Sequence, residues 1–132
     1  MPSFDSFLHP ERKSHAKFKM RGFGDAKFEM RVVSREDEAL IRDQYPNADL
    51  ADQMDLMLAF SLVNPPLLKK EFLDALSKRE GRPILDPLEA FQAVFDANET
   101  KFLWSKYSEL ADLTVNTEKK IEEIKNASGE GA

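Results

Sequence analysis

The side chains that could bind a metal ion or transfer a proton are few and poorly grouped. The sequence has two histidines, His9 and His15, and both fall in a polar N-terminal stretch without a hydrophobic period. No carboxylate or third ligand stands at a convincing spacing from them, and metal binding or acid–base catalysis needs a rigid arrangement. The absence of cysteine excludes disulfides, thiolate metal sites and cysteine nucleophiles. We therefore expect solvated histidines, no metal and no cofactor.

Other sequence patterns that could indicate a catalytic or phosphate-binding site are incomplete. Gly22-Phe23-Gly24 leads into a predicted strand and no Lys-Ser/Thr follows it, so it indicates a turn and not a phosphate loop. The acidic pairs Glu36/Asp37 and Glu122/Glu123 lie in predicted helices, where neighbouring side chains point about 100° apart. No serine sits in a glycine-flanked nucleophile elbow. Because no catalytic set is complete, we predict that the protein is not an enzyme.

The composition is that of one folded domain. The chain has 132 residues, of which 42% are hydrophobic and 33% charged, with ten Phe, two Tyr and one Trp. No apolar run approaches the roughly 18 residues that cross a bilayer, and the first ten residues lack a basic segment followed by an apolar one. We expect a cytosolic protein that is neither secreted nor membrane-bound.

The net charge of −5 hides an asymmetry between the two parts of the chain. Residues 1–35 carry eight Lys/Arg and four Asp/Glu, a net +4, which leaves −9 for residues 36–132. A basic arm could touch phosphate, but the acidic remainder would repel a polyanion. Nucleic-acid binding is therefore not expected.

The elements that position these residues follow from the hydrophobic pattern. Strict alternation over Ala16–Arg21 and Ala26–Val33, with glycines between them, predicts a β-hairpin. Capping residues and apolar stripes then predict helices from Ser34 to Tyr45, from Asp49 to Val63, over Leu67–Lys78, from Asp86 through Phe95, and over Thr117–Asn126. The helix after Asp86 either breaks near Asn98 or continues to about Leu113. The all-apolar segment Leu56–Val63 is expected at the centre of the fold.

These elements predict an α+β fold, mainly α, with an N-terminal β-hairpin followed by about five helices packed as a compact bundle. We expect a flexible arm over residues 1–15, one globular domain over 16–126 (hairpin 16–33, helical part 34–126) and a disordered tail over 127–132.

Apolar residues between Lys101 and Leu113 cover more of a helix than one core face needs. On a helical projection Phe102 and Leu113 lie together, and Trp104 lies further round an arc of about 200°. One interpretation is a helix deep in the core, where large aromatics usually pack. The other is that this surface binds a partner, with Phe102, Trp104 and Leu113 as the candidate contact residues.

The order of elements resembles a known family. The chain resembles the XkdN-like tail assembly chaperones of long-tailed phages in the order of its first elements. These elements are the charged arm, the two alternating strands, the helix start Ser34-Arg35-Glu36-Asp37, the apolar helix ending Leu62-Val63-Asn64-Pro65 and its Leu67-Leu68 continuation. The Asp86-Pro87-Leu88 helix start and the closing segment from Ile121 to Asn126 are similar to that family too. The resemblance covers about residues 10–126.

The resemblance implies a chaperone of bacteriophage or prophage origin. Such a protein binds the tape-measure protein, keeps its apolar faces from aggregating and helps recruit tail-tube subunits before it is displaced. The expected location is the cytoplasm of the bacterial host and not the mature virion, with a weak homo-oligomer as an open question. Two alternatives remain: another phage accessory, such as a connector or tube-completion protein using an edge strand, and a small bacterial regulator using the basic arm.

Overall fold

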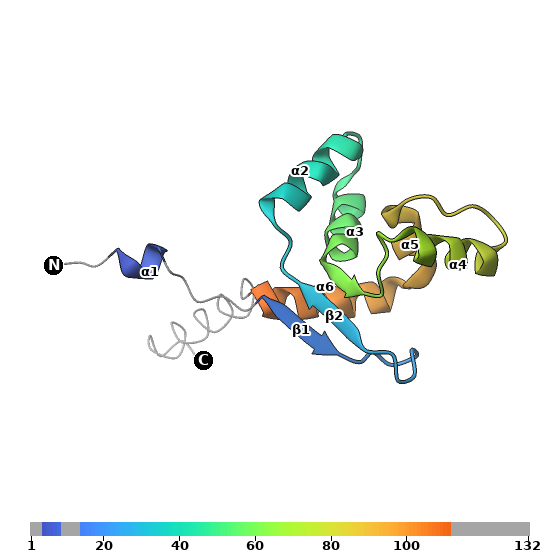
Figure 1. Cartoon of the computed structure of the whole chain (residues 1–132), viewed down its shortest axis with the longest axis horizontal. Coiled ribbons are helices and arrows are strands. Elements are labelled where there is room, and N and C mark those ends of the chain that lie inside the picture. Colours follow the sequence, from blue (N-terminus) through green and yellow to red (C-terminus); the bar gives the residue numbers. More distant parts are fainter. Residues whose placement is uncertain (1–3, 9–13, 112–132) are drawn as a thin grey trace, which may run out of the picture.

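The computed structural model describes residues 4–8 and 14–111, and it has the mainly helical α+β fold that the sequence predicts (Figure 1). Five helices of eight or more residues follow the hairpin strands in this part of the chain. The elements in order are α1 (Asp5–Leu8), β1 (His15–Phe18), β2 (Phe28–Arg31), α2 (Arg35–Gln44), α3 (Leu50–Ser61), β3 (Leu62–Asn64), α4 (Lys70–Glu80), α5 (Pro87–Val94) and α6 (Ala97–Ala111).

The predicted hairpin is present, with shorter strands and a longer connection than the alternation indicates. β1 and β2 pair antiparallel from His15 opposite Arg31 to Phe18 opposite Phe28, so residues 19–27 form the connection. Gly22 and Gly24 both have positive φ angles in this connection, as the sequence indicates. Met20 lies beyond β1 and is nevertheless buried, which shows that the alternating side chains still mark the core face.

A third strand corrects the sequence prediction, which placed Leu62 and Val63 in a helix. In the structure α3 ends at Ser61, and β3 pairs antiparallel with β2, with Leu62 opposite Met30. Pairing gives the inner edge of β2 a hydrogen-bonded neighbour and buries Leu62, two gains that a local pattern cannot show. Proline at 65 stops any helix from continuing, and the Asn64–Pro65 peptide is cis.

Three helix starts form as the sequence predicts. The Ser34 hydroxyl accepts a hydrogen bond from the Asp37 amide (3.1 Å), and the Asp37 carboxylate accepts one from the Ser34 amide (3.0 Å), which completes a capping box. Asp49 caps α3, and Asp86 caps α5 with Pro87 at its first turn. Local chemistry therefore sets the entry of the chain into α2, α3 and α5.

Two helix boundaries differ from the expected ones. α4 begins at Lys70 and not at Leu67, because the amides of Leu67 and Lys69 bond back to Pro65 and Pro66 in tight turns. The helix after Asp86 breaks at Phe95, where the backbone is extended, just before Asn98. A reciprocal pair of bonds between Asp96 and Glu99 then starts α6, with distances of 2.9 and 2.7 Å.

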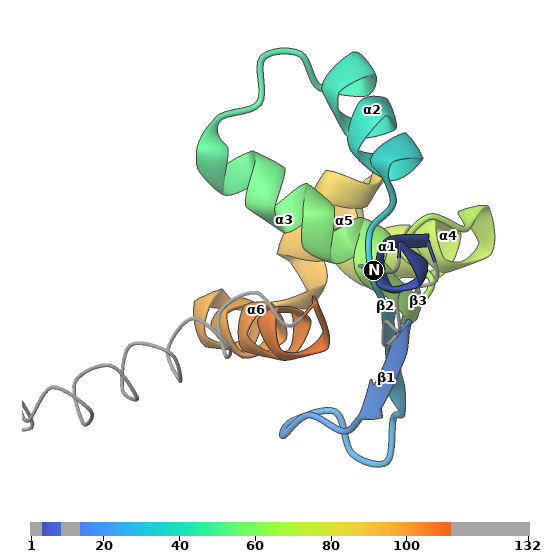
Figure 2. The same ribbon diagram turned by 90° about the vertical axis from the view of Figure 1, so that its left-hand side faces the viewer.

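The core lies between the sheet and the helices. α6 runs along one face of the sheet, and α2 and α3 rise beyond it (Figures 1 and 2). α3 packs against α2, α5 and α6, and its residues Leu56, Leu58, Ala59 and Phe60 are buried. This confirms the central position expected for residues 56–62. The expectation is wrong for Val63, which lies in β3 with Leu62 and keeps 41% of its surface exposed.

The chain ends are described only in part. Residues 4–8 form one helical turn, where no element is expected from the sequence, and β1 already begins at His15 inside the predicted arm. The predicted helix over Thr117–Asn126 and the predicted tail over residues 127–132 lie outside the described residues.

Candidate partner-binding surfaces

Phe102 lies on the outer side of α6, where it forms a patch with Phe18 of β1 and Lys106 of α6. Its side chain keeps 38% of its surface exposed, and its ring centroid lies 6.0 Å from that of Phe18. The Lys106 ammonium lies 5.5 Å from the Phe102 centroid and 5.8 Å from the Phe18 centroid, within the range of cation–π attraction. We call these three residues the Phe102 patch. It offers an apolar ring beside a positive charge.

The Phe102 patch rests on a continuous set of aromatic contacts. Phe18 stacks on Phe28 at 5.5 Å with an interplanar angle of 11°, and the Phe28 ring also contacts Phe23 and Phe95. Phe28 and Phe95 are buried, so the patch is supported from the core. A rigid aromatic group requires little ordering when a partner binds, which favours its use as an anchor.

Trp104 is not part of the Phe102 patch. It is half-buried and stacks on Tyr107, with ring centroids 5.8 Å apart and an interplanar angle of 21°. Tyr107 is buried, and Trp104 packs against the core cluster. The core interpretation therefore describes Trp104 better than Phe102. Leu113, the third candidate contact residue, lies outside the described residues.

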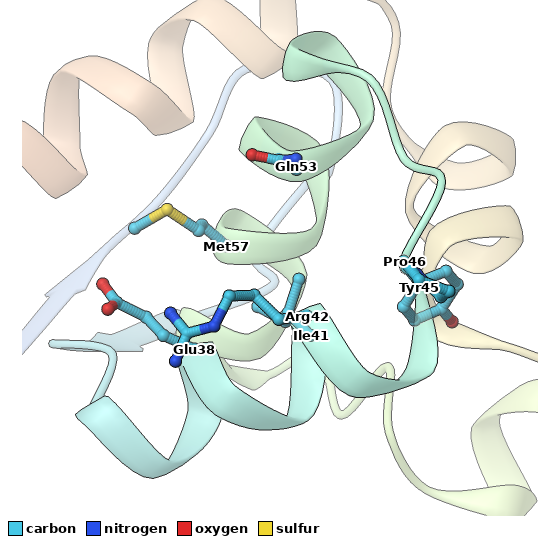
Figure 3. Close-up of a pocket in the computed structure, with 7 residues that line it drawn as sticks. All are labelled: Glu38, Ile41, Arg42, Tyr45, Pro46, Gln53 and Met57. Carbon is cyan, nitrogen blue, oxygen red and sulfur yellow. The ribbon is translucent and has the colours of Figure 1, made fainter.

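A groove between α2 and α3 is a second apolar surface, which the sequence alone does not reveal. It has a volume of about 450 Å³ and is drawn in Figure 3. The lining residues come from both helices and from the turn after α2: Glu38, Ile41, Arg42, Tyr45, Pro46, Gln53 and Met57. We call this the α2–α3 groove. The α2–α3 groove depends on how the two helices pack, and no local sequence pattern encodes their separation.

One end of the α2–α3 groove is fixed by Tyr45. Burial, followed by the negative charge of Asp86 and a hydrogen bond with its carboxylate, raises the pKa of Tyr45 to about 12. Tyr45 therefore remains a neutral hydroxyl at physiological pH and ties the end of α2 to the capping residue of α5.

The N-terminal turn α1 exposes a third apolar surface. Phe4, Phe7 and Leu8 keep 72%, 82% and 67% of their surfaces exposed. The amides of Phe7 and Leu8 both donate to the carbonyl of Phe4, which closes a single helical turn. The sequence shows these apolar residues but gives no period by which to place them on one face.

In the described part of the chain, the side chains that could bind a metal ion or transfer a proton do not form a cluster. Among residues 4–8 and 14–111, no three His, Asp or Glu side chains are placed to hold a metal ion. His15 is exposed at the start of β1 and bonds to the Ser14 hydroxyl, whereas His9 lies outside the described residues. None of the described helices is both long and apolar enough to span a bilayer.

Comparisons with known proteins give no relative from which a function could be carried over. No protein-family model, no curated protein and no solved structure matches this chain.

Proposed function

We propose that the protein is a tail assembly chaperone of a tailed bacteriophage or prophage, which binds the tape-measure protein in the bacterial cytoplasm and helps recruit tail-tube subunits. The order of its sequence elements, which resembles that family, supports the proposal. The structural observation that carries it is the Phe102 patch, an exposed aromatic side chain held on a rigid base.

The chemistry of the patch suits an amphipathic helix. A long, largely helical rod exposes apolar stripes until the tail tube encloses it, and a small protein can cover such a stripe by contacts with its helical surfaces. Phe102 would meet an apolar side chain of the rod, and Lys106 would meet an acidic one at the edge of the stripe. The Lys106 ammonium already lies 3.7 Å from the Glu109 carboxylate. An acidic side chain of the rod would replace Glu109 as its partner, so this charge contact would add little affinity.

Weak individual contacts fit a transient function. A chaperone that must be displaced during assembly gains from several modest contacts along the rod, because each can be lost in turn. Three other exposed apolar side chains provide further contact points: Leu40 of α2, Leu50 of α3 and Leu68, which precedes α4.

Co-expression with the tape-measure protein that the proposal requires in the same phage or prophage genome tests it. The wild-type chain should raise the soluble yield of that protein, and Phe102→Asp should reduce the increase several-fold while leaving the circular dichroism spectrum unchanged. Leu85→Asp is the matched control, since Leu85 is an exposed apolar residue outside the Phe102 patch. No increase with the wild-type chain, or an equal increase with Phe102→Asp, would overturn the proposal.

An open strand edge favours a second candidate function, that of a connector or tube-completion protein. The strand order β1-β2-β3 leaves the outer edge of β1 without a paired strand in the part of the chain that the structure describes. Such an edge can accept a strand from a neighbouring subunit. Stable rings on a sizing column in the absence of any tape-measure protein would favour this function over the first.

A further inference from the structure

Two apolar surfaces are not used by the proposed contact at the Phe102 patch: the side chains of α1 and the α2–α3 groove. Phe4, Phe7 and Leu8 are exposed, and the groove is an open space whose lining residues Ile41, Tyr45 and Met57 rest on the core.

Phe4, which precedes α1, forms one face with Phe7 and Leu8 of α1. Phe4, Phe7 and Leu8 stand at positions i, i+3 and i+4, which lie side by side on a helical turn. This is the spacing with which short amphipathic helices place their anchors in a groove. Three such side chains left in water forgo the hydrophobic stabilisation of burial, which provides a driving force for a docked state.

The α2–α3 groove has the complementary character. Ile41 lines the groove and is buried, and Met57 of α3, which has a flexible thioether, lines it too and is half-buried. Methionine adapts its shape to an incoming aromatic ring at low cost. A volume of about 450 Å³ accommodates side chains of the size of phenylalanine.

Chain connectivity keeps α1 within reach of this groove. Six residues separate Leu8 from His15, so the two residues can lie at most about 25 Å apart. His15 pairs with Arg31 at the end of β2, and the Arg31 guanidinium contacts the Asp37 carboxylate of α2 at 2.8 Å. Asp37 directly precedes Glu38, which lines the groove. The N-terminal segment is therefore attached beside the helix that forms one wall.

We propose that the α2–α3 groove binds the Phe4-Phe7-Leu8 face of the same chain, in equilibrium with the exposed arrangement in Figure 1. Tethering gives α1 an effective concentration of about millimolar at the groove, which favours the chain's own segment over that of a second copy. In the docked state α1 shields the groove from other chains. This docking does not depend on the proposed chaperone function.

Paramagnetic broadening in the full-length protein tests the docking. Because the chain has no cysteine, Ser3→Cys provides one attachment point for a nitroxide beside Phe4. The methyl resonance of Met57 should broaden several-fold more than that of Met30, a buried residue of β2. Adding Phe4→Asp and Phe7→Asp to the labelled chain should remove most of the excess broadening at Met57, whereas adding Leu85→Asp should not.

Each other result would overturn the proposal. Absence of excess broadening at Met57 would mean that α1 does not dock in the groove. Broadening that persists in the Phe4→Asp/Phe7→Asp chain would mean that the tether, and not the apolar side chains, sets the position of the label. Broadening seen only when nitroxide-labelled chains are mixed with isotope-labelled chains would assign the groove to a second copy.

Discussion

The phenolic oxygen of Tyr107 in α6 accepts a hydrogen bond, 3.1 Å long, from the backbone amide of Val33, the residue that leads from β2 toward α2. The two residues are 74 positions apart in the sequence, and both side chains are buried. This bond satisfies an amide that no strand partner reaches in the described chain. It therefore joins α6, which carries the Phe102 patch, to the start of the helix that forms one wall of the α2–α3 groove.

Tyr107→Phe should destabilise the protein by about 1–3 kcal/mol, because it leaves the Val33 amide without an acceptor. Urea unfolding followed by circular dichroism measures the change. Tyr45→Phe is the matched control: it removes the hydrogen bond to Asp86 near the surface, and should cost no more than about 1 kcal/mol. Equal losses in the two variants would contradict the role assigned to the Tyr107–Val33 bond.

The Arg31–Asp37 contact should make stability depend on acidic pH. Burial alone would raise the pKa of Asp37, but hydrogen bonds from Arg31 and from the Ser34 amide and hydroxyl, with the charge of Arg31, lower it below its ordinary value of 3.8. A lowered pKa in the folded state means that the stabilisation is complete above the ordinary value and is lost as pH falls through the folded-state pKa.

Asp37→Asn should therefore lower the free energy of unfolding at pH 7 by about 1–2 kcal/mol and flatten its fall below about pH 4. Thermal unfolding from pH 2.5 to 7 measures both effects. Asp43→Asn removes an exposed carboxylate from the same helix and should change stability by no more than about 0.5 kcal/mol. An unchanged pH profile in Asp37→Asn would show that other carboxylates dominate the acid transition.

Asp55 of α3 should behave in the opposite way. Burial raises its pKa, a hydrogen bond from Gln92 lowers it, and the negative charges of Asp52 and Asp49 raise it further, so that the net shift is upward. The raised folded-state pKa means that ionised Asp55 costs stability at neutral pH and that this cost disappears as pH falls through that pKa.

Asp55→Asn keeps an acceptor for Gln92 without the charge, and should stabilise the protein at pH 7 by about 0.5–1 kcal/mol. The gain over the wild type should vanish toward pH 3, where the carboxyl is protonated. Denaturant unfolding at both pH values measures it, and a loss of stability at pH 7 would contradict the unfavourable charge.

The fold was predictable where local chemistry decides it. Ser34, Asp49 and Asp86 cap helices with their own side chains, and each cap forms at the expected residue. β3 was not predictable in this way, because Leu62-Val63 continues an apolar helical run and only the distant edge of β2 selects the strand. The break before α6 did leave a signal, since Asp96 and Glu99 have the spacing of a capping box.

The candidate site was predictable only in part. Helical projection shows that apolar residues of α6 cover too wide an arc for one core face, but it cannot tell which part of that arc the sheet covers. The structure answers this through Phe18 and Phe28, which reach α6 from the hairpin and leave Phe102 at the edge of the covered area. The α2–α3 groove depends likewise on how two helices pack, which no single segment encodes.

Truncation of the two large aromatic residues in α6 should separate their roles. Trp104→Ala removes the ring that stacks on Tyr107 and packs against the core, and should cost about 2–4 kcal/mol. Phe102→Ala removes a ring that is 38% exposed and contacts Phe18 and Lys106, and should cost about 1 kcal/mol or less. Guanidinium unfolding measures both losses, with near-ultraviolet circular dichroism as a check on core packing. A larger loss for Phe102→Ala than for Trp104→Ala would make Phe102 a core residue and remove the basis for the Phe102 patch as a binding surface.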